Sequence, residues 1–138
     1  MPATTAKRES KAVKRSKPDQ VIHDIAKYVD SYKVKSELAY NTAHYCLIDT
    51  LGCAFLALAY PECTKLLGPA FTDVAVTNGA RVPGTSYSLD PIQAVFSFCA
   101  MVRWLEFNDA TWGETVSHPS DTFAAILVVA DWLSRQRV

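Results

Sequence analysis

The chain has 138 residues and a mass of 15.2 kDa, and its formal net charge is zero. That length suits one domain and leaves no room for two. With 49% apolar and 20% charged residues, the composition excludes a disordered or fibrous protein. No apolar stretch approaches the ~18–20 residues that cross a bilayer, so an integral membrane protein is not expected.

The charges are distributed unevenly along the chain. Residues 1–17 hold six basic residues and one acid, a balance of +5, whereas residues 18–138 have a balance of −5. This pattern predicts a solvated, disordered basic tail at 1–17 and a folded domain at 18–138. A mitochondrial targeting segment is the alternative for the tail; it has no apolar run of the secretory kind. We expect a cytoplasmic protein, or one of the mitochondrial matrix if the tail is a targeting segment.

Nucleic acid is not an expected partner, because no aromatic residue interleaves the basic residues of the tail. The four cysteines form no CxxC pair, so neither a zinc site nor an iron–sulfur cluster is predicted. No secretory signal favours a disulfide scaffold. We therefore expect four reduced thiols that act as small core residues, without a metal or cofactor.

The first half of the chain predicts two helices. Pro18 and Asp19 open the first, and Ser36 caps a second, longer one. Apolar residues on the second helix step by three and four, which indicates a buried face. His44 lies on this face and is expected to be a core histidine, and Gly52 suggests a close approach of another helix. Pro61 is expected to end the helix.

Residues 61–89 are irregular in pattern, with short extended pieces expected at 74–76 and 81–82. Asp90 followed by Pro91 is a strong start for a third main helix, and Gln93 can complete a capping box. This helix is expected to stop near Asn108.

A polar loop over 108–120 leads to the last helix, for which Ser120 or Asp121 is the expected cap. Residues 123–133 are apolar on nearly every side, so this helix requires burial all round. The chain therefore resembles the front of a larger helical domain: an incomplete all-α domain with about four main helices. The three tryptophans are expected to be packing groups, namely Trp104, Trp112 and Trp132.

The densest polar cluster lies between the last two helices, over residues 103–121. It supplies carboxylates, an amide, hydroxyls and His118, whose imidazole titrates nearest neutral pH and can serve as a general acid or base. No GxSxG, phosphate-binding or HExxH motif accompanies it. From residues alone, helix caps and turns are the alternative interpretation.

Several blocks of this sequence resemble the early part of the MmgE/PrpD family, which includes the 2-methylcitrate dehydratases. The similarity covers about residues 20–138. The blocks are YNTAHYCLIDTLGC (40–53), KLLGP (65–69), RVPGT (81–85), LDPIQA (89–94), RWLEFND (103–109), HPSD (118–121) and ADWLSR (130–135).

The resemblance implies a cofactor-free dehydratase that removes water from 2-methylcitrate, or a related alkylcitrate, to give an aconitate-type alkene. Propionate metabolism and fungal alkylcitrate-derived polyketide pathways are the expected settings. The partners it implies are a small tricarboxylate and a second copy in a homodimer, or a complementing chain. One alternative is a truncated, non-catalytic family member that acts through a partner chain; a further alternative is a cis-aconitate decarboxylase-like enzyme.

Carried over by position, the resemblance implies catalytic roles for His118, Asp109, Glu106 and Thr111. His118 would be the acid/base group, and Asp109 would orient it or contact the substrate. Glu106 stands where the family has Asp. The family's threonine has either become Ala110 or moved to Thr111.

Substrate binding is expected at Arg103 and Ser120, although Arg103 could instead anchor its own helix. A tricarboxylate carries about three negative charges at neutral pH. The active-site lysines of the family come from later sequence that this chain does not contain.

Overall fold

The computed structural model describes residues 18–71 and 76–136. The tail predicted at 1–17 and the extended residues Val74 and Ala75 lie outside this part of the chain. The chain divides into two compact units, residues 1–35 and 36–138, and each is described by itself.

The described part of the first unit contains helix α1 (Gln20–Ser31), which confirms the first predicted helix. Asp19 is its N-cap residue but makes no side-chain capping bond. None of the residues of α1 is buried, and Val21, Ile22 and Ile25 are each more than half exposed. The apolar stripe of α1 is therefore present, and its side chains are exposed.

The second unit begins with the long helix α2 (Glu37–Ala57), and Ser36 caps it as predicted by accepting the N–H of Ala39 at 3.2 Å. Its buried residues all lie in its second half: Thr50, Cys53, Ala54 and Ala57. The prediction that His44 is a core histidine is wrong, because this side chain lies on the exposed first half. The close helix approach expected at Gly52 is also wrong, since no atom lies within 4 Å of a Cβ built there.

The irregular segment contains a short helix α3 (Pro61–Thr64) and the paired strands β1 (Ala80–Arg81) and β2 (Ser88–Leu89). Pro61 was expected to end the preceding helix, but α2 already ends at Ala57. Pro61 instead starts α3, because proline suits the first position of a helix.

Helix α4 (Pro91–Arg103) starts as predicted, with one Asp90 carboxylate oxygen accepting the N–H groups of Ile92 and Gln93 at 3.1 Å each. The capping box does not form, because the Gln93 side chain donates to the carbonyl of Gly68 at 2.9 Å. The helix ends at Arg103, five residues before the predicted end near Asn108.

The loop after α4 carries a second two-stranded pair, β3 (Thr111–Trp112) and β4 (Val116–Ser117). Helix α5 (Pro119–Gln136) begins one to two residues earlier than its expected cap. The packing role predicted for Trp112 is wrong, since this side chain is 82% exposed. Trp104 and Trp132 do pack against the core.

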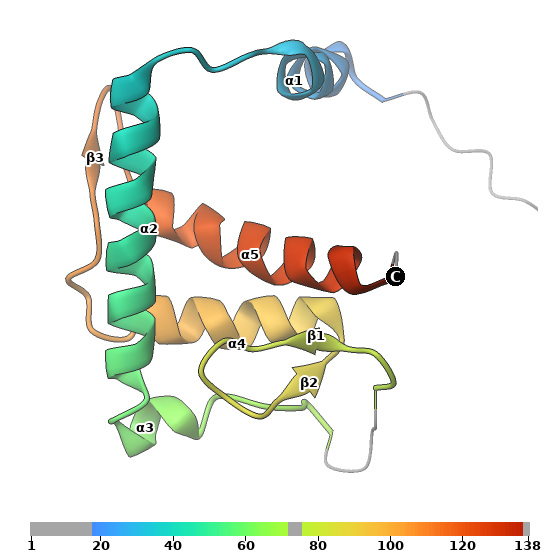
Figure 1. The fold of residues 1–138 in the computed structure, drawn as a ribbon, viewed down its shortest axis with the longest axis vertical. Helices are drawn as coiled ribbons and strands as arrows, with labels where there is room; N and C mark the ends of the chain where they lie inside the picture. Colours follow the sequence, from blue (N-terminus) through green and yellow to red (C-terminus); the bar gives the residue numbers. More distant parts are fainter. Residues whose placement is uncertain (1–17, 72–75, 137–138) are drawn as a thin grey trace, which may run out of the picture. The chain divides into compact units, whose positions relative to one another are not determined.

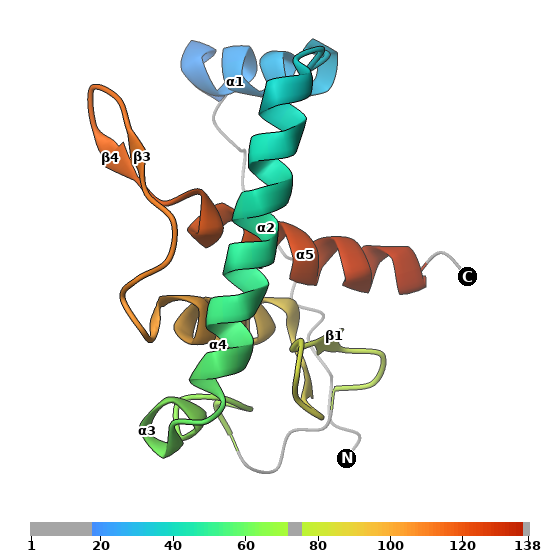
Figure 2. The same cartoon turned by 60° about the vertical axis from the view of Figure 1, so that its left-hand side comes forward.

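Helices α4 and α5 lie side by side, run in opposite directions, and both cross α2 (Figures 1 and 2). The core forms where these three helices and the β1–β2 pair meet, around Phe98, Met101 and Val128. The predicted all-α class is confirmed. None of the helices in the described ranges is long and apolar enough to cross a membrane.

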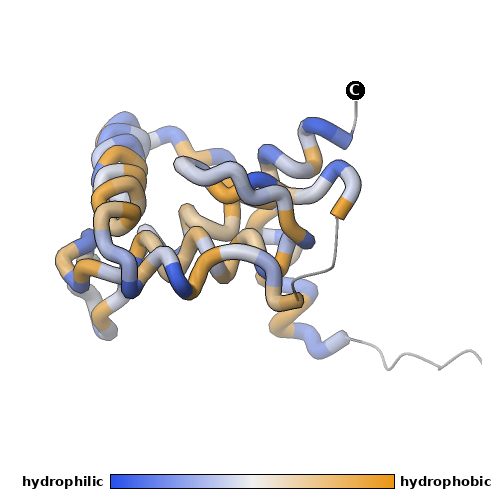
Figure 3. The backbone as a smooth tube through the Cα atoms, turned by 90° about the horizontal axis from the view of Figure 1, so that it is seen from below, coloured by the Kyte–Doolittle hydropathy of each residue, from blue (hydrophilic) through white to orange (hydrophobic). Residues whose placement is uncertain are grey.

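The all-round burial expected for the last helix is not observed. Only Ser120, Ala124 and Val128 of α5 are buried, and Ile126 is 54% exposed. Apolar bands alternate with polar ones along the helices (Figure 3), and much of the apolar surface of α2 and α5 stays in contact with solvent.

Candidate active site

The site begins with a contact between His118 and the backbone of Asp109. The Nδ1 atom of His118 lies 2.6 Å from the carbonyl oxygen of Asp109. A carbonyl oxygen only accepts, so Nδ1 carries the hydrogen in this contact. In the neutral ring Nε2 is then the acceptor, which is the arrangement a general base requires. The structure thus brings together two of the predicted residues, although Asp109 orients the ring through its backbone and not its carboxylate.

The carboxylate of Asp109 is occupied at the start of α5. Both of its oxygens lie 3.2 Å from the backbone nitrogen of Ser120 and accept its N–H. The first N–H groups of a helix have no partner within the helix, and its N-terminus favours negative charge. Asp109 therefore caps α5 from ten residues before Pro119.

Two further residues of this site come from α2 and were missed by the sequence analysis. The Asp49 carboxylate accepts the backbone N–H of Asp109 at 3.1 Å. Burial first, and then the negative charges of Asp109 and Asp49, raise the pKa of the Cys46 thiol above its ordinary value. A raised pKa favours the protonated thiol, which is a weaker nucleophile than the thiolate.

A signal for Asp49 was present in the sequence. It is the only Asp, Glu, Lys or Arg between Glu37 and Glu62. An isolated charge in an uncharged stretch of helix draws attention to Asp49, but its exposed side chain does not by itself require a protein partner. The partner itself lies 60 residues away in sequence, so the residue pattern did not identify it.

Arg103 and Ser120, the predicted substrate ligands, are linked by Asn108. The Nη1 atom of Arg103 donates to Asn108 Oδ1 at 2.9 Å, and Asn108 Nδ2 donates to the hydroxyl of Ser120. Ser120 is fully buried, whereas the Arg103 side chain is 33% exposed and lies 3.8 Å from the carboxylates of Glu106 and Asp121. This network joins the end of α4 to the start of α5.

Glu106 and Thr111 lie outside the cluster. Among the described residues, no hydrogen bond or ion pair joins either of them to His118. Glu106 has a positive φ of 58° and a 79% exposed side chain. Its backbone conformation is one that Asp and Asn adopt more readily than Glu. Thr111 is exposed and pairs with Ser117 in the β3–β4 pair.

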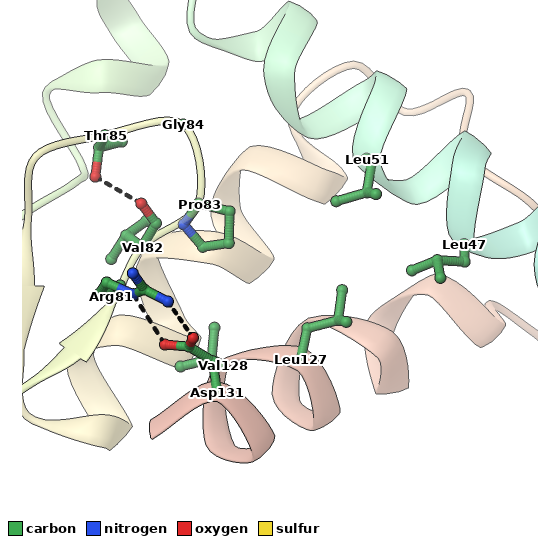
Figure 4. A pocket seen from close by; sticks show the side chains of 10 residues that line it. All are labelled: Leu47, Leu51, Arg81, Val82, Pro83, Gly84, Thr85, Leu127, Val128 and Asp131. Carbon is green, nitrogen blue, oxygen red and sulfur yellow. Dashed lines mark hydrogen bonds and ion pairs between the residues drawn. The ribbon is translucent and has the colours of Figure 1, made fainter. Parts of the chain in front are cut away.

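A separate apolar cavity of about 440 Å³ lies between α2, α5 and the turn after β1 (Figure 4). Leu47 and Leu51 of α2 face Leu127 of α5 across it, and an ion pair between Arg81 and Asp131 lies at one side. None of the six predicted site residues lines this cavity. The His118 cluster and the cavity are thus distinct features on the same helices.

Comparison with known proteins decides the family. The profile of the MmgE/PrpD N-terminal domain matches residues 23–137. The chain belongs to the MmgE/PrpD family. A 2-methylcitrate dehydratase of Cupriavidus necator is 54% identical over 130 residues, which are 94% of this chain and 27% of that protein.

Two other MmgE/PrpD relatives show the same partial coverage. A 2-methylcitrate dehydratase of Salmonella typhi is 56% identical over 120 residues, 87% of this chain and 25% of that protein. The mitochondrial 2-methylcitrate dehydratase of Yarrowia lipolytica is 43% identical over 121 residues, 88% of this chain and 23% of that protein. The chain spans about a quarter of the length of these curated relatives.

Proposed function

We propose that this MmgE/PrpD chain takes part in the dehydration of 2-methylcitrate to an aconitate-type alkene. The observation that carries the proposal is the His118 imidazole, whose Nδ1–H is held by the Asp109 carbonyl at 2.6 Å. The names of the three relatives described above, each a 2-methylcitrate dehydratase, support this choice of substrate. A related alkylcitrate is the alternative substrate.

The chemistry needs one proton removed from carbon and one delivered to the departing hydroxyl. Nε2 of His118 takes the proton from the carbon next to the hydroxyl-bearing one, the carbon–carbon double bond forms, and the hydroxyl leaves as water after receiving a proton from an acid. Glu106 and Thr111 stay proposed as further catalytic groups. Arg103 is the proposed partner for a substrate carboxylate, because it is a partly exposed cation in the network of Asn108 and Ser120.

The test is the purified chain incubated with 2-methylcitrate, with alkene formation followed by ultraviolet absorbance and product identity by mass spectrometry. The full-length Cupriavidus necator relative serves as the reference for assay conditions. cis-Aconitate and an alkylcitrate are run alongside to detect decarboxylation or a different substrate preference. Alkene formation that requires this chain supports the proposal, and an inactive chain beside an active relative contradicts an independent enzyme.

A second candidate function follows from the apolar surface of α2. Tyr45, Ile48 and Leu56 are each at least half exposed, and covering such side chains normally stabilises a domain. In this candidate the chain is not catalytic by itself and acts when a second copy or a complementing chain covers these residues. Light scattering after size-exclusion chromatography separates the two candidate functions. An active monomer contradicts this second candidate, and activity that rises with dimer formation supports it.

For location we propose the cytoplasm, with residues 1–17 as a tail and residues 18–138 as the domain. The Yarrowia lipolytica relative is named as a mitochondrial protein. Fluorescent fusions with and without residues 1–17 test the assignment. A mitochondrial signal that depends on residues 1–17 contradicts the cytoplasmic one.

A further inference from the structure

Asp109 is the point at which three parts of the second unit meet. Its backbone N–H donates to Asp49 of α2, its carbonyl accepts from His118, and its carboxylate accepts from Ser120 of α5. The loop around it has little other support, since residues 110–117 are all exposed and the two strands within it have two residues each. The position of the Asp109 backbone therefore depends on a few side-chain contacts.

We propose that Asp49 is a positioning residue for His118: by accepting the Asp109 N–H, it fixes the carbonyl that selects the Nδ1–H form of the imidazole. Asp49 acts through Asp109 and does not touch the reacting atoms. The inference rests on the proposed function only for its effect on catalysis, because the effect on the His118 ring is a property of the fold.

The hydrogen-bond geometry explains why this effect is specific. In a neutral histidine the hydrogen resides on the nitrogen whose partner is an acceptor, and the other nitrogen is left as the base. If the Asp109 carbonyl moves out of reach, Nδ1 loses its acceptor and the hydrogen can reside on Nε2. The ring then presents a hydrogen, and not a lone pair, at the atom proposed to take the proton. A misplacement of ~1 Å can by itself cost on the order of a hundredfold in rate.

The alternative is that Asp49 only ties α2 to the loop and so adds stability. Three substitutions separate these roles. Asp49→Asn keeps an oxygen that accepts the N–H and removes the charge, whereas Asp49→Ala removes the acceptor. Glu62→Ala removes an exposed carboxylate on α3 and is the control for charge and surface effects.

The decisive readout is the tautomer of His118, measured on the ¹⁵N-labelled chain from imidazole nitrogen shifts and their coupling to ring hydrogens. The chain has three histidines, and a His118→Asn variant assigns the His118 signals. We expect the Nδ1–H form in the unsubstituted chain, in Asp49→Asn and in Glu62→Ala, and a loss of this form in Asp49→Ala. If Asp49→Ala keeps the Nδ1–H form while its circular dichroism is unchanged, the proposal is overturned.

Amide exchange of the unsubstituted chain keeps the test valid even if Asp49→Ala does not fold. The N–H of Asp109 should exchange more slowly than those of the exposed residues 113–115. Exchange as fast as theirs overturns the proposal. In the dehydration assay, Asp49→Ala should lower kcat at least tenfold with KM changed less than threefold, and Asp49→Asn should restore most of kcat. An inactive chain with an Asp49-dependent tautomer would contradict an independent enzyme and leave this inference standing.

Discussion

Both carboxylate oxygens of Asp109 lie 3.2 Å from the backbone nitrogen of Ser120, so α5 is capped by a residue from the loop before it. Loss of a side-chain cap costs about 0.5–2 kcal/mol. Asp109→Ala should lower the free energy of unfolding by about 1 kcal/mol, and Asp109→Asn should lower it less because the amide oxygen still accepts the N–H. Urea unfolding followed by circular dichroism measures both. Equal losses in the two variants would show that charge, and not capping, is responsible.

The Cys46 thiol should react slowly with iodoacetamide at neutral pH. Burial and the carboxylates of Asp109 and Asp49 raise its pKa, so little thiolate is present. Asp109→Asn removes one of these charges and should make Cys46 react faster. Cys63 is the matched control, because burial alone raises its pKa. Peptide mass spectrometry resolves the two thiols, and an equal acceleration at Cys63 would indicate general loosening instead.

Two glycines should respond oppositely to alanine. A Cβ at Gly79 would lie 2.6 Å from the Leu89 carbonyl oxygen, which belongs to the paired backbone of β2. Gly79→Ala should destabilise the chain by about 1–3 kcal/mol. A Cβ at Gly52 meets nothing within 4 Å, so Gly52→Ala should stabilise α2 by about 0.5–1 kcal/mol. Thermal unfolding compares them, and destabilisation by Gly52→Ala would show that another surface covers this part of α2.

The ion pair between Arg81 and Asp131 predicts a pH dependence of stability. Hydrogen bonds from Arg81 and then Arg135 hold the pKa of Asp131 below its ordinary value. A lowered folded-state pKa contributes stability above the unfolded value of about 3.9, and this is lost as pH falls through the folded value. Asp131→Asn should therefore make the loss of stability on the acid side shallower. The Arg81 side chain is 63% exposed, so the effect should be modest and decrease with salt.

The comparison can be made by unfolding the chain in urea between pH 3 and pH 7. Glu62→Gln is the control, as it removes an exposed carboxylate on α3. An acid-side curve for Asp131→Asn that superimposes on that of the unsubstituted chain would contradict this prediction.

The sequence was most informative where local chemistry determines the structure. Ser36 and Asp90 cap α2 and α4 because their side chains reach N–H groups only two or three residues away. Pro61 is ambiguous in the sequence because proline both terminates and initiates helices. The spacing of His44 predicts a core position and the residue type of Trp112 predicts packing, but burial depends on which surfaces meet, and nothing in the described part of the chain covers these two side chains.

The candidate site shows the same difference between what the sequence predicts and what depends on tertiary packing. The resemblance to MmgE/PrpD proteins singled out His118 and Asp109, and the structure joins them. It did not predict that the backbone of Asp109 makes the contact, or that Asp49 of α2 accepts the Asp109 N–H. Such contacts link residues some 60 positions apart, and only tertiary packing brings them together.

The central claim is that His118 handles the proton in a dehydration, and the most direct measurement is the rate of alkene formation from 2-methylcitrate by His118→Asn. An asparagine amide can still donate to the Asp109 carbonyl but cannot act as a base. The account predicts that the unsubstituted chain is active and that kcat of the variant is lowered by about 10²–10⁴-fold. The circular dichroism of the variant should be unchanged. A variant that retains kcat within about threefold, or an unsubstituted chain without activity beside the active Cupriavidus necator relative, would contradict it.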